Sequence, residues 1–243
     1  MNKLEHKVEF DHILAHYELS KQAKELLDRL RLVLLAGPTA SGRNTIIDQL
    51  IKKGNYKYIV SDTTRAPRIN NGIPEKNGVN YFFKSEEEFL FDLKKGEFLE
   101  AEIIHERQVS GISIRELATA EKSGKIAITE VEIGGFANIL SRKADTIGIL
   151  ILPPSFEVWI ERINARSEME KEEVLSRLNT GVRIFKEALR DKHISIVIND
   201  YLEKAVAEVD AIVNSRSMPD STIGLALVKQ LLNETEAYLG EMS

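Results

Sequence analysis

Short, mainly apolar runs alternate with longer stretches of helical periodicity along most of the chain. Four such runs, at 32–36, 126–131, 146–152 and 194–198, are typical of strands that are buried on both faces of a sheet. The segments between them place apolar residues at intervals of three and four, which predicts helices. Because strands and helices alternate, the pattern predicts an α/β fold in which helices cover both faces of a parallel sheet.

The region between residues 79 and 112 has a different pattern, with short strands around one helix, and predicts a small mixed subdomain inserted into the larger fold. A capping box at Ser85–Glu88 opens its helix, and Gly96 ends it. A further strand is expected at 58–61, and a second capping box at Ser113–Glu116 opens the helix that follows the subdomain. The elements expected within the subdomain are a strand at 81–83, a helix at 86–95, and paired strands at 98–104 and 108–112.

Helical periodicity continues beyond both ends of this alternation. Residues 4–30 predict one or two amphipathic helices, and residues 222–240 predict another after a linker at 215–221. The charged stretch between 155 and 189 fits a solvated helix or a flap better than a core. The apolar stripes of the terminal helices allow packing on the core, pairing with each other, or formation of a homodimer.

A glycine-bracketed loop follows the first predicted strand directly and opens a helix. It has the pattern Gly37-x-x-x-x-Gly42, with Arg43, Asn44 and Thr45 after the second glycine. Strand, glycine loop and helix N-terminus form the layout that surrounds nucleotide phosphates with backbone N–H groups. The usual residues after the second glycine are Lys and then Ser or Thr, so Arg43 retains the charge and Asn44 offers an amide oxygen to Mg²⁺. The alternative interpretation is an ordinary strand-to-helix turn.

Composition and charge narrow the classes of function. The 243 residues include no cysteine, which excludes disulfides, thiol nucleophiles and cysteine-based zinc sites. The net charge of −5 argues against nucleic-acid binding, which requires a basic face. No apolar run approaches the ~18 residues of a membrane span, and the first residues mix both charges, unlike a signal peptide. We therefore expect a cytoplasmic protein with no membrane segment.

Two arginines, Arg65 and Arg68, lie three residues apart in a polar loop that Pro67 stiffens. Their guanidinium groups can both bind one dianionic phosphate in a forked arrangement, and the hydroxyl of Tyr81 is a third donor. Solvated surface charge is the alternative for either arginine alone. The pair predicts a site for the phosphate of a phosphorylated acceptor.

Seven segments occur in the order found in guanylate kinases, and on these the chain resembles that family of phosphate-loop nucleoside monophosphate kinases. The segments cover roughly residues 32–213 and are GPTASGRNT, SDTTRAPR, NGVNYFF, GEFLEAEII, TEVEIGG, LPPS and VIND. The resemblance implies a three-layer fold with a five-stranded parallel sheet. The implied domains are a helical extension at 1–30, a guanylate kinase-like domain at 31–213 with a monophosphate-binding subdomain at 61–113 and a lid at 157–183, and a linker with a C-terminal helix at 214–243.

The same resemblance implies transfer of a phosphoryl group from ATP to GMP or dGMP, with Mg²⁺. It implies that ATP binds to Gly37, Pro38, Thr39, Ala40, Ser41, Gly42, Arg43, Asn44, Thr45 and Asn199. It implies that GMP binds to Ser61, Arg65, Arg68, Tyr81, Glu100, Ser110, Glu130 and Glu132, with Glu100 accepting the N1–H and amino group of guanine. The implied catalytic arginines are Arg43, Arg166 and Arg177, and the implied metal ligands are Asn44 and Glu130.

The chain also departs from the family's pattern around the acceptor. Glu130 and Glu132 stand where aspartates are usual, and Ser110 stands where the family has a tyrosine that binds phosphate. Together with Arg43 and Asn44, these changes leave two alternatives open. One is a kinase-derived binding module with little or no turnover, and the other is a kinase for a different phosphorylated acceptor.

Overall fold

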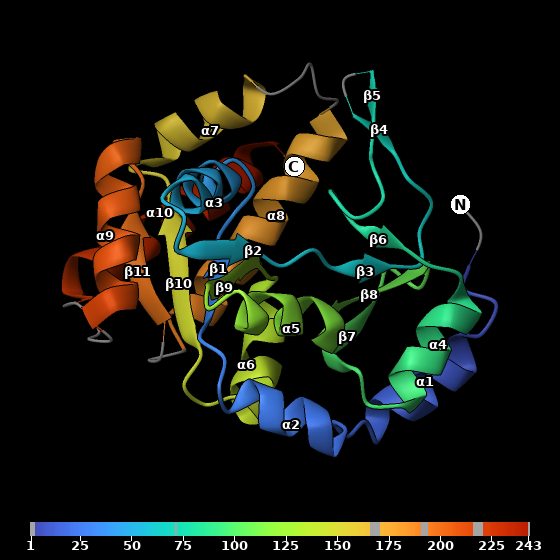
Figure 1. Ribbon diagram of the computed structural model, residues 1–243. Helices are drawn as coiled ribbons and strands as arrows, with labels where there is room; N and C mark the ends of the chain where they lie inside the picture. Colours follow the sequence, from blue (N-terminus) through green and yellow to red (C-terminus); the bar gives the residue numbers. More distant parts are fainter. Residues whose placement is uncertain (1–2, 71, 166–170, 191–193, 216–220, 243) are drawn as a thin grey trace. The chain divides into compact units, whose positions relative to one another are not determined.

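The computed structural model describes residues 3–70, 72–165, 171–190, 194–215 and 221–242 (Figure 1). The chain divides into two compact units. The first comprises residues 1–32, 56–127 and 138–145, and the second comprises residues 33–55, 128–137 and 146–243. Each unit is assembled from segments that are distant in the sequence.

A five-stranded parallel sheet has the strand order β11-β10-β1-β9-β2. In register, Leu35 of β1 pairs with Ile149 of β10, and Leu150 of β10 pairs with Ile196 of β11. The predicted buried runs are confirmed as strands, and the α/β fold class is confirmed with them. The five strands are β1 (Leu32–Ala36), β2 (Tyr56–Tyr58), β9 (Ile126–Glu130), β10 (Ile147–Leu152) and β11 (Ile194–Ile198).

The strand predicted at 58–61 is wrong in its bounds. Strand β2 ends at Tyr58, and the next strand, β3 (Asp62–Thr63), belongs to a different sheet. Ile59 and Val60 are buried although they lie in the connection between the two strands. An apolar run therefore marks burial here and not a continuous strand, because the connection itself is covered.

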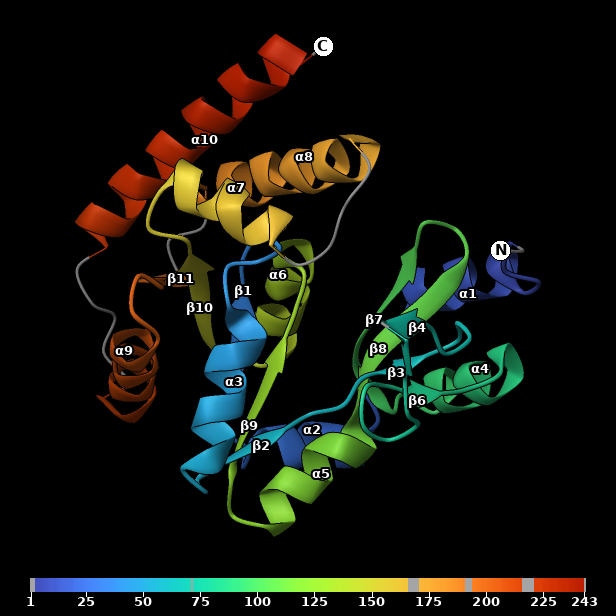
Figure 2. The ribbon, with the colours of Figure 1, turned by 90° about the horizontal axis from the view of Figure 1, so that it is seen from above.

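Helices cover both faces of the sheet, which gives three layers (Figure 2). On one face, Gly148 of β10 leaves room for Phe136, since a Cβ at residue 148 would lie 1.9 Å from its ring. On the same face, Gly224 packs against Ile196 of β11. No helix in the described part of the chain is long and apolar enough to span a bilayer. The helices around the sheet are α3 (Arg43–Lys52), α6 (Ile133–Arg142), α7 (Phe156–Asn164), α8 (Lys171–Ala188), α9 (Leu202–Ser215) and α10 (Thr222–Met242).

The first unit contains a four-stranded mixed sheet of order β6-β3-β8-β7, as expected for an inserted subdomain. The capping box at Ser85–Glu88 is confirmed with both of its hydrogen bonds. Ser113 caps the following helix by accepting from the N–H of Glu116. The remaining elements of this unit are β4 (Ile69–Asn70), β5 (Ile73–Pro74), β6 (Phe82–Phe83), α4 (Glu86–Lys94), β7 (Phe98–Ile104), β8 (Gln108–Ser113) and α5 (Ile114–Lys122).

The terminal segments form helices that pack on the rest of their own unit. Helices α1 (Lys7–Ala15) and α2 (Lys21–Leu27) belong to the first unit, where Phe10 and Phe98 both contact the ring of Phe89. Helix α10 belongs to the second unit and lies beside α8 (Figure 2). The first of the three predicted arrangements, packing on the core, is thus observed at both ends.

Candidate nucleotide-binding site

The loop between β1 and α3 requires glycine at both ends. Gly37 has a φ of +152° and Gly42 a φ of +95°, and Ala40 between them has a φ of +64°. A Cβ at Gly37 would lie 2.4 Å from the carbonyl oxygen of Ile151, and one at Gly42 would lie 2.2 Å from Nδ2 of Asn199. Side chains are excluded by both the backbone conformation and the lack of space. The loop is therefore a compact turn that opens directly onto the N-terminus of α3.

Two side chains from distant segments hold the loop by its carbonyl groups. The indole N–H of Trp159 donates to the carbonyl of Thr39 at 2.7 Å, and the amide of Asn199 donates to the carbonyl of Ser41 at 2.8 Å. The backbone N–H of Asn199 is itself fixed on the carbonyl of Leu152 at 2.8 Å. The first N–H groups of α3 have no helical acceptor and attract an anion. The backbone of the loop is thus held from two sides at the point where α3 begins.

The residues after Gly42 place a charged pair at the start of α3. Nη1 of Arg43 lies 3.8 Å from Oε2 of Glu130 at the end of β9, and both side chains are partly exposed. Asn44 and Thr45 are exposed on the first turn. No group of three metal-ligating side chains occurs among the described residues. Because Mg²⁺ typically takes one or two protein oxygens beside phosphates and water, the oxygens of Asn44 and Glu130 fit its chemistry.

A pocket of about 350 Å³ adjoins the loop. Asn199 lines it, as the sequence predicts for a nucleotide-binding residue. Arg162 and Asp200 also line it, and sequence reasoning missed both. In the sequence, Arg162 lies four residues before Arg166 and Asp200 directly follows Asn199, so each is a near neighbour of a predicted site residue. The described residues that line it are Ala40, Gly42, Thr45, Arg162, Ala165, Asn199, Asp200 and Leu202.

Of the two predicted lid arginines, Arg177 lies on α8, where its Nη2 is 2.6 Å from Oε1 of Glu173 one turn earlier. Arg166 lies outside the described residues. On the same helix, Arg183 pairs with Glu132 at 2.6 Å, and both side chains are more than half exposed. Glu130 and Glu132 therefore belong to the loop-containing unit, where both already face an arginine.

The predicted phosphate-binding arginines have different surroundings in the first unit. The guanidinium of Arg65 is buried, makes a two-point ion pair with Glu75, and stacks 4.7 Å from the ring centroid of Tyr81. Arg68 is exposed, and its backbone N–H donates to the same carboxylate at 2.8 Å. The arginine pair lowers the pKa of Glu75 to about 2, chiefly through the hydrogen bonds from Arg65. Sequence reasoning missed Glu75, which no local motif marks.

Glu100 lies on β7, the edge strand of the mixed sheet, and its carboxyl group is half-buried. Burial is the main cause that raises its pKa to about 7, Glu102 adds to the rise, and Arg142 opposes it. A carboxyl group that faced water from an edge strand would not have its pKa raised by burial in this way. Glu100 is thus a half-buried carboxyl group whose protonated form is favoured by burial and by Glu102.

The two serines predicted at the acceptor site also belong to the first unit. The hydroxyl of Ser110 on β8 is 2.7 Å from the hydroxyl of Thr63 on β3, and Gln108 donates to it at 3.3 Å. The carbonyl of Ser61 accepts from the N–H of Phe82 at 2.9 Å. The structure therefore brings Ser61, Arg65, Arg68, Tyr81, Glu100 and Ser110 into one unit.

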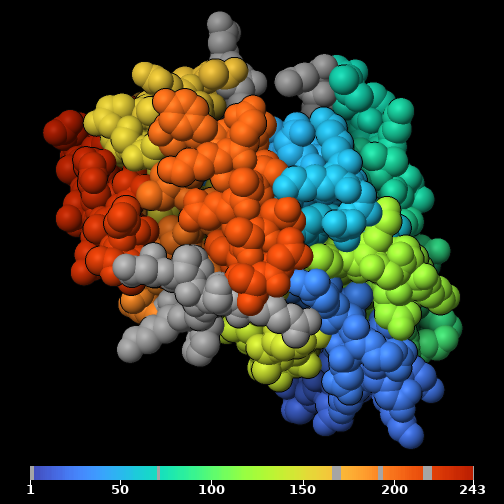
Figure 3. All heavy atoms as spheres, turned by 60° about the vertical axis from the view of Figure 1, so that its left-hand side comes forward, coloured from blue at the N-terminus to red at the C-terminus, as the bar shows by residue number. Residues whose placement is uncertain are grey.

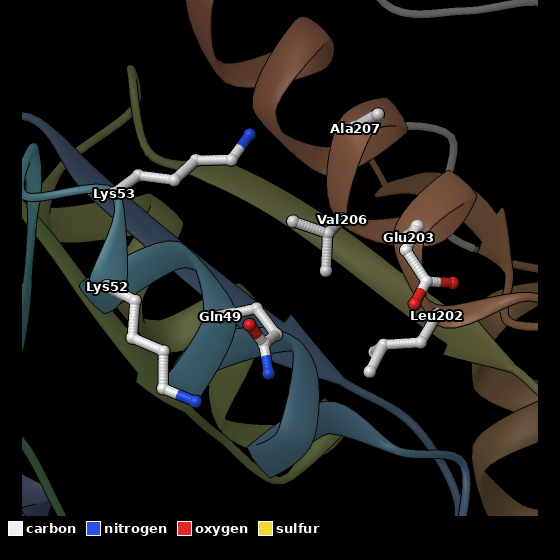
Figure 4. A pocket seen from close by; sticks show the side chains of 7 residues that line it. All are labelled: Gln49, Lys52, Lys53, Leu202, Glu203, Val206 and Ala207. Carbon is white, nitrogen blue, oxygen red and sulfur yellow. The ribbon is translucent and has the colours of Figure 1, made fainter.

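A second groove, of about 430 Å³, lies between α3 and α9, which are neighbours on the surface in Figure 3. In Figure 4, Gln49, Lys52 and Lys53 line the groove on one side, and Leu202, Glu203, Val206 and Ala207 of α9 line it on the other. Lys53 is paired with Asp210 at 2.8 Å. The C-terminal half of α3 lines this groove, and none of its lining residues is a predicted site residue.

A parallel sheet whose first strand runs through a left-handed glycine loop into a helix N-terminus defines a phosphate-loop nucleotide-binding protein of the α/β class. The guanylate kinase family profile matches residues 29–216. The chain belongs to the guanylate kinase family.

Relatives with that name cover most of the same region. The chain is 36% identical over 188 residues to a guanylate kinase of Corynebacterium diphtheriae, a match that covers 76% of this chain and 95% of the relative. It is 36% identical over 186 residues to one of Halalkalibacterium halodurans, with 76% and 87% covered. The crystal structure of guanylate kinase from Anaplasma phagocytophilum has the same fold, with a TM-score of 0.57 and 21% identity over 79% of this chain and 88% of that one.

Proposed function

We propose that this protein transfers the γ-phosphoryl group of ATP to GMP and releases ADP and GDP. The observation that carries the proposal is the preformed loop between Gly37 and Gly42, which is built to hold phosphates and belongs to a chain of the guanylate kinase family. Glu100 supports the choice of acceptor base. It is a half-buried carboxyl group, and the adjacent N1–H and amino group of guanine are the two donors that one carboxylate accepts together.

The donor nucleotide is assigned to the loop-containing unit. ATP phosphates bind the backbone from Gly37 to Thr45, and the pocket beside Asn199 receives the rest of the nucleotide. The Asn199 side chain is committed to the carbonyl of Ser41, so we assign it to shaping this pocket as well as lining it. Residues 157–183 are assigned as the lid, in which Arg166 and Arg177 approach the transferred group.

The acceptor is assigned to the subdomain at 61–113. Arg68 is exposed and free to turn toward a phosphate, whereas Arg65 must share its guanidinium between the phosphate and Glu75. Tyr81 stacks on Arg65, and its hydroxyl is assigned as a further phosphate donor. Ser110 supplies a shorter donor than the tyrosine that is usual in the family, so we expect one phosphate contact fewer.

The reaction needs positioning and neutralisation of charge more than proton transfer. The attacking oxygen of the acceptor phosphate is already anionic, so no general base is required. Arg43, Arg166 and Arg177 compensate the negative charge that spreads over the transferred group. Mg²⁺, with ATP as co-substrate, supplies further charge compensation when bound, and Asn44 and Glu130 are the side chains that would hold it.

We also propose a cellular location and an assembly for this protein. The nucleotide substrates and the absence of cysteine fit a reducing, cytoplasmic setting, and no nucleic-acid partner is expected from a net charge of −5. A homodimer through the terminal helices would use Val8 and Ile223, which are 83% and 76% exposed. A monomeric mass by light scattering at assay concentration would remove the dimer.

The test is formation of ADP from ATP and Mg²⁺ with GMP, dGMP, AMP, CMP and UMP in parallel. We expect turnover with GMP and dGMP and little with the other three. Turnover of another acceptor in place of GMP would show a kinase of different specificity. Silence with every acceptor, from protein shown to be folded, would overturn the proposal in favour of a binding module.

A further inference from the structure

The segment between α1 and α2, which precedes the region matched to the family, runs along the start of β7. The N–H of Ser20 donates to the carbonyl of Gly96 at 3.1 Å, and its hydroxyl donates to Glu97 at 3.2 Å. A Cβ at Gly96 would lie 2.4 Å from the nitrogen of Ser20, so the two backbones touch. This contact fixes the chain four residues before Glu100.

The hydroxyl of Tyr17 binds both backbone groups of Phe98. It donates to the Phe98 carbonyl and accepts from the Phe98 N–H, each at 2.7 Å. Because β7 is an edge strand, these groups have no neighbouring strand on that side. The register of β7 against β8 shifts between Phe98 and Glu100, which is a bulge. Bulges redirect the side chains that follow them, and Tyr17 holds this one in place.

Arg142 completes the arrangement from the end of α6. Its Nη1 donates to the carbonyl of Leu99 at 2.5 Å, and its guanidinium lies 5.0 Å from the ring centroid of Tyr17. Ser20, Tyr17 and Arg142 thus form hydrogen bonds with the three residues that precede Glu100. Arg142 also lowers the pKa of Glu100, against the rise caused by burial and by Glu102.

We propose that Tyr17 and Arg142 are positioning residues that set the orientation of Glu100 and thereby the affinity and selectivity for the guanine base. This inference rests on the proposed function. It assigns a role in base recognition to the N-terminal extension, which lies before residue 29, where the match to the family begins. Tyr17 acts through the backbone at the bulge, and Arg142 acts through both the backbone and its charge.

The first test is Tyr17→Phe, which removes the hydroxyl and keeps the ring. We expect the dissociation constant for GMP to rise about 3- to 10-fold, because two backbone groups lose their partner and the bulge relaxes. We also expect the preference for GMP over IMP, which lacks the amino group, to fall. Tyr201→Phe, which removes the hydroxyl of a 68% exposed tyrosine, is the matched control and should change neither quantity.

The second test separates the charge of Arg142 from its hydrogen bond. Arg142→Met should move the midpoint of the pH dependence of guanosine binding upward, since the remaining charged neighbour, Glu102, favours the protonated carboxyl group. Arg142→Lys retains the charge and should restore the midpoint while weakening binding. A role in stability alone would lower the melting temperature and leave the midpoint and the selectivity unchanged.

A double-mutant cycle decides the mechanism. If Tyr17 acts through Glu100, then Tyr17→Phe should have no further effect on the ratio of GMP to IMP affinity in a Glu100→Gln background. An equal loss in both backgrounds would overturn the inference. The proposed function fails separately, if the wild-type protein does not distinguish GMP from AMP. The inference alone fails if Glu100→Gln abolishes the preference for GMP over AMP and Tyr17→Phe leaves that preference unchanged.

Discussion

The phosphate loop and the acceptor subdomain depart from their family's pattern in opposite ways. In the loop, two side chains differ from the usual pair, yet the backbone between Gly37 and Gly42 is held by Trp159 and Asn199. In the subdomain proposed to bind the acceptor, Arg65, Tyr81 and Glu100 match the usual pattern, whereas Ser110 replaces a tyrosine. The position of Arg65 depends on Glu75, and the pKa of Glu100 depends on burial, Glu102 and Arg142.

This difference shows where each site is sensitive to change. A site built from backbone amides tolerates new side chains but not a new backbone conformation. A site built from side chains tolerates small backbone shifts only where neighbouring residues hold those side chains or their backbone in place. Glu75 holds the guanidinium of Arg65 in this way, and Arg142 holds the carbonyl of Leu99. We therefore expect glycine substitutions to reduce ligand binding most in the unit that contains the loop. Carboxylate substitutions should reduce it most in the unit that contains Glu75 and Glu100.

The largest expected effect is that of Gly37→Ala on the donor side. A Cβ at this position meets the backbone of Ile151, which cannot move aside as a side chain could. We expect kcat/KM for ATP to fall by about 10²–10³-fold, the range seen when fixed anion donors are lost. Gly54→Ala is the control, because Gly54 also has a positive φ, +90°, but open space around it. An equal fall of kcat/KM for ATP in both variants would mean that the backbone of the loop has no particular role in ATP binding.

An intermediate effect is expected from pH on the acceptor side. With the pKa of Glu100 raised to about 7, the ligand-free carboxyl group is protonated below that pH. Guanine binding needs the ionised form, so affinity should fall about tenfold per pH unit below 7. Guanosine is the ligand to titrate, because the phosphate of GMP itself changes charge near ~6. Binding of guanosine that is flat from pH 5.5 to 8 would contradict the assignment.

The same shift has a consequence for stability, which Glu100→Gln tests. A carboxyl group whose pKa is raised on folding destabilises the folded state as pH rises from about 4.5 through about 7, and the full penalty remains above that. Glu100→Gln should therefore raise the melting temperature at pH 8 and change it least near pH 4.5. The variant would be more stable and less selective, which a purely structural glutamate would not produce.

The smallest effect is expected from Arg43→Lys. The contact of Arg43 with Glu130 is loose, at 3.8 Å and partly exposed, and the backbone carries most of the phosphate binding. We expect the KM for ATP to change by less than about threefold, with any larger change confined to kcat. A large rise in the KM for ATP would show that the arginine, and not the loop backbone, is the main donor.

Local signals in the sequence predicted much of the fold. The buried runs, the glycine loop and the capping box at Ser85 each depend on residues within a few positions of one another, so their structures follow from local chemistry. The strand expected at 58–61 was wrong because Ile59 and Val60 are buried by their surroundings and not by strand pairing.

The supporting contacts of the candidate site could not be predicted in the same way. Tyr17 reaches Phe98 across 81 positions, and Arg142 reaches Leu99 across 43. Arg65 and Glu75 are ten positions apart, at the two ends of a hairpin whose short strands carry little pattern. Such pairs are set by tertiary packing, and a single sequence contains no periodicity that joins them.

The most direct test of the two-site account is a calorimetric titration of ATP and of GMP into Gly37→Ala and Glu100→Gln. The account predicts opposite results for the two variants. Gly37→Ala should lose ATP binding and retain GMP binding, whereas Glu100→Gln should retain ATP binding and lose its preference for GMP over AMP. Loss of both ligands in both variants, or retention of GMP preference in Glu100→Gln, would contradict it.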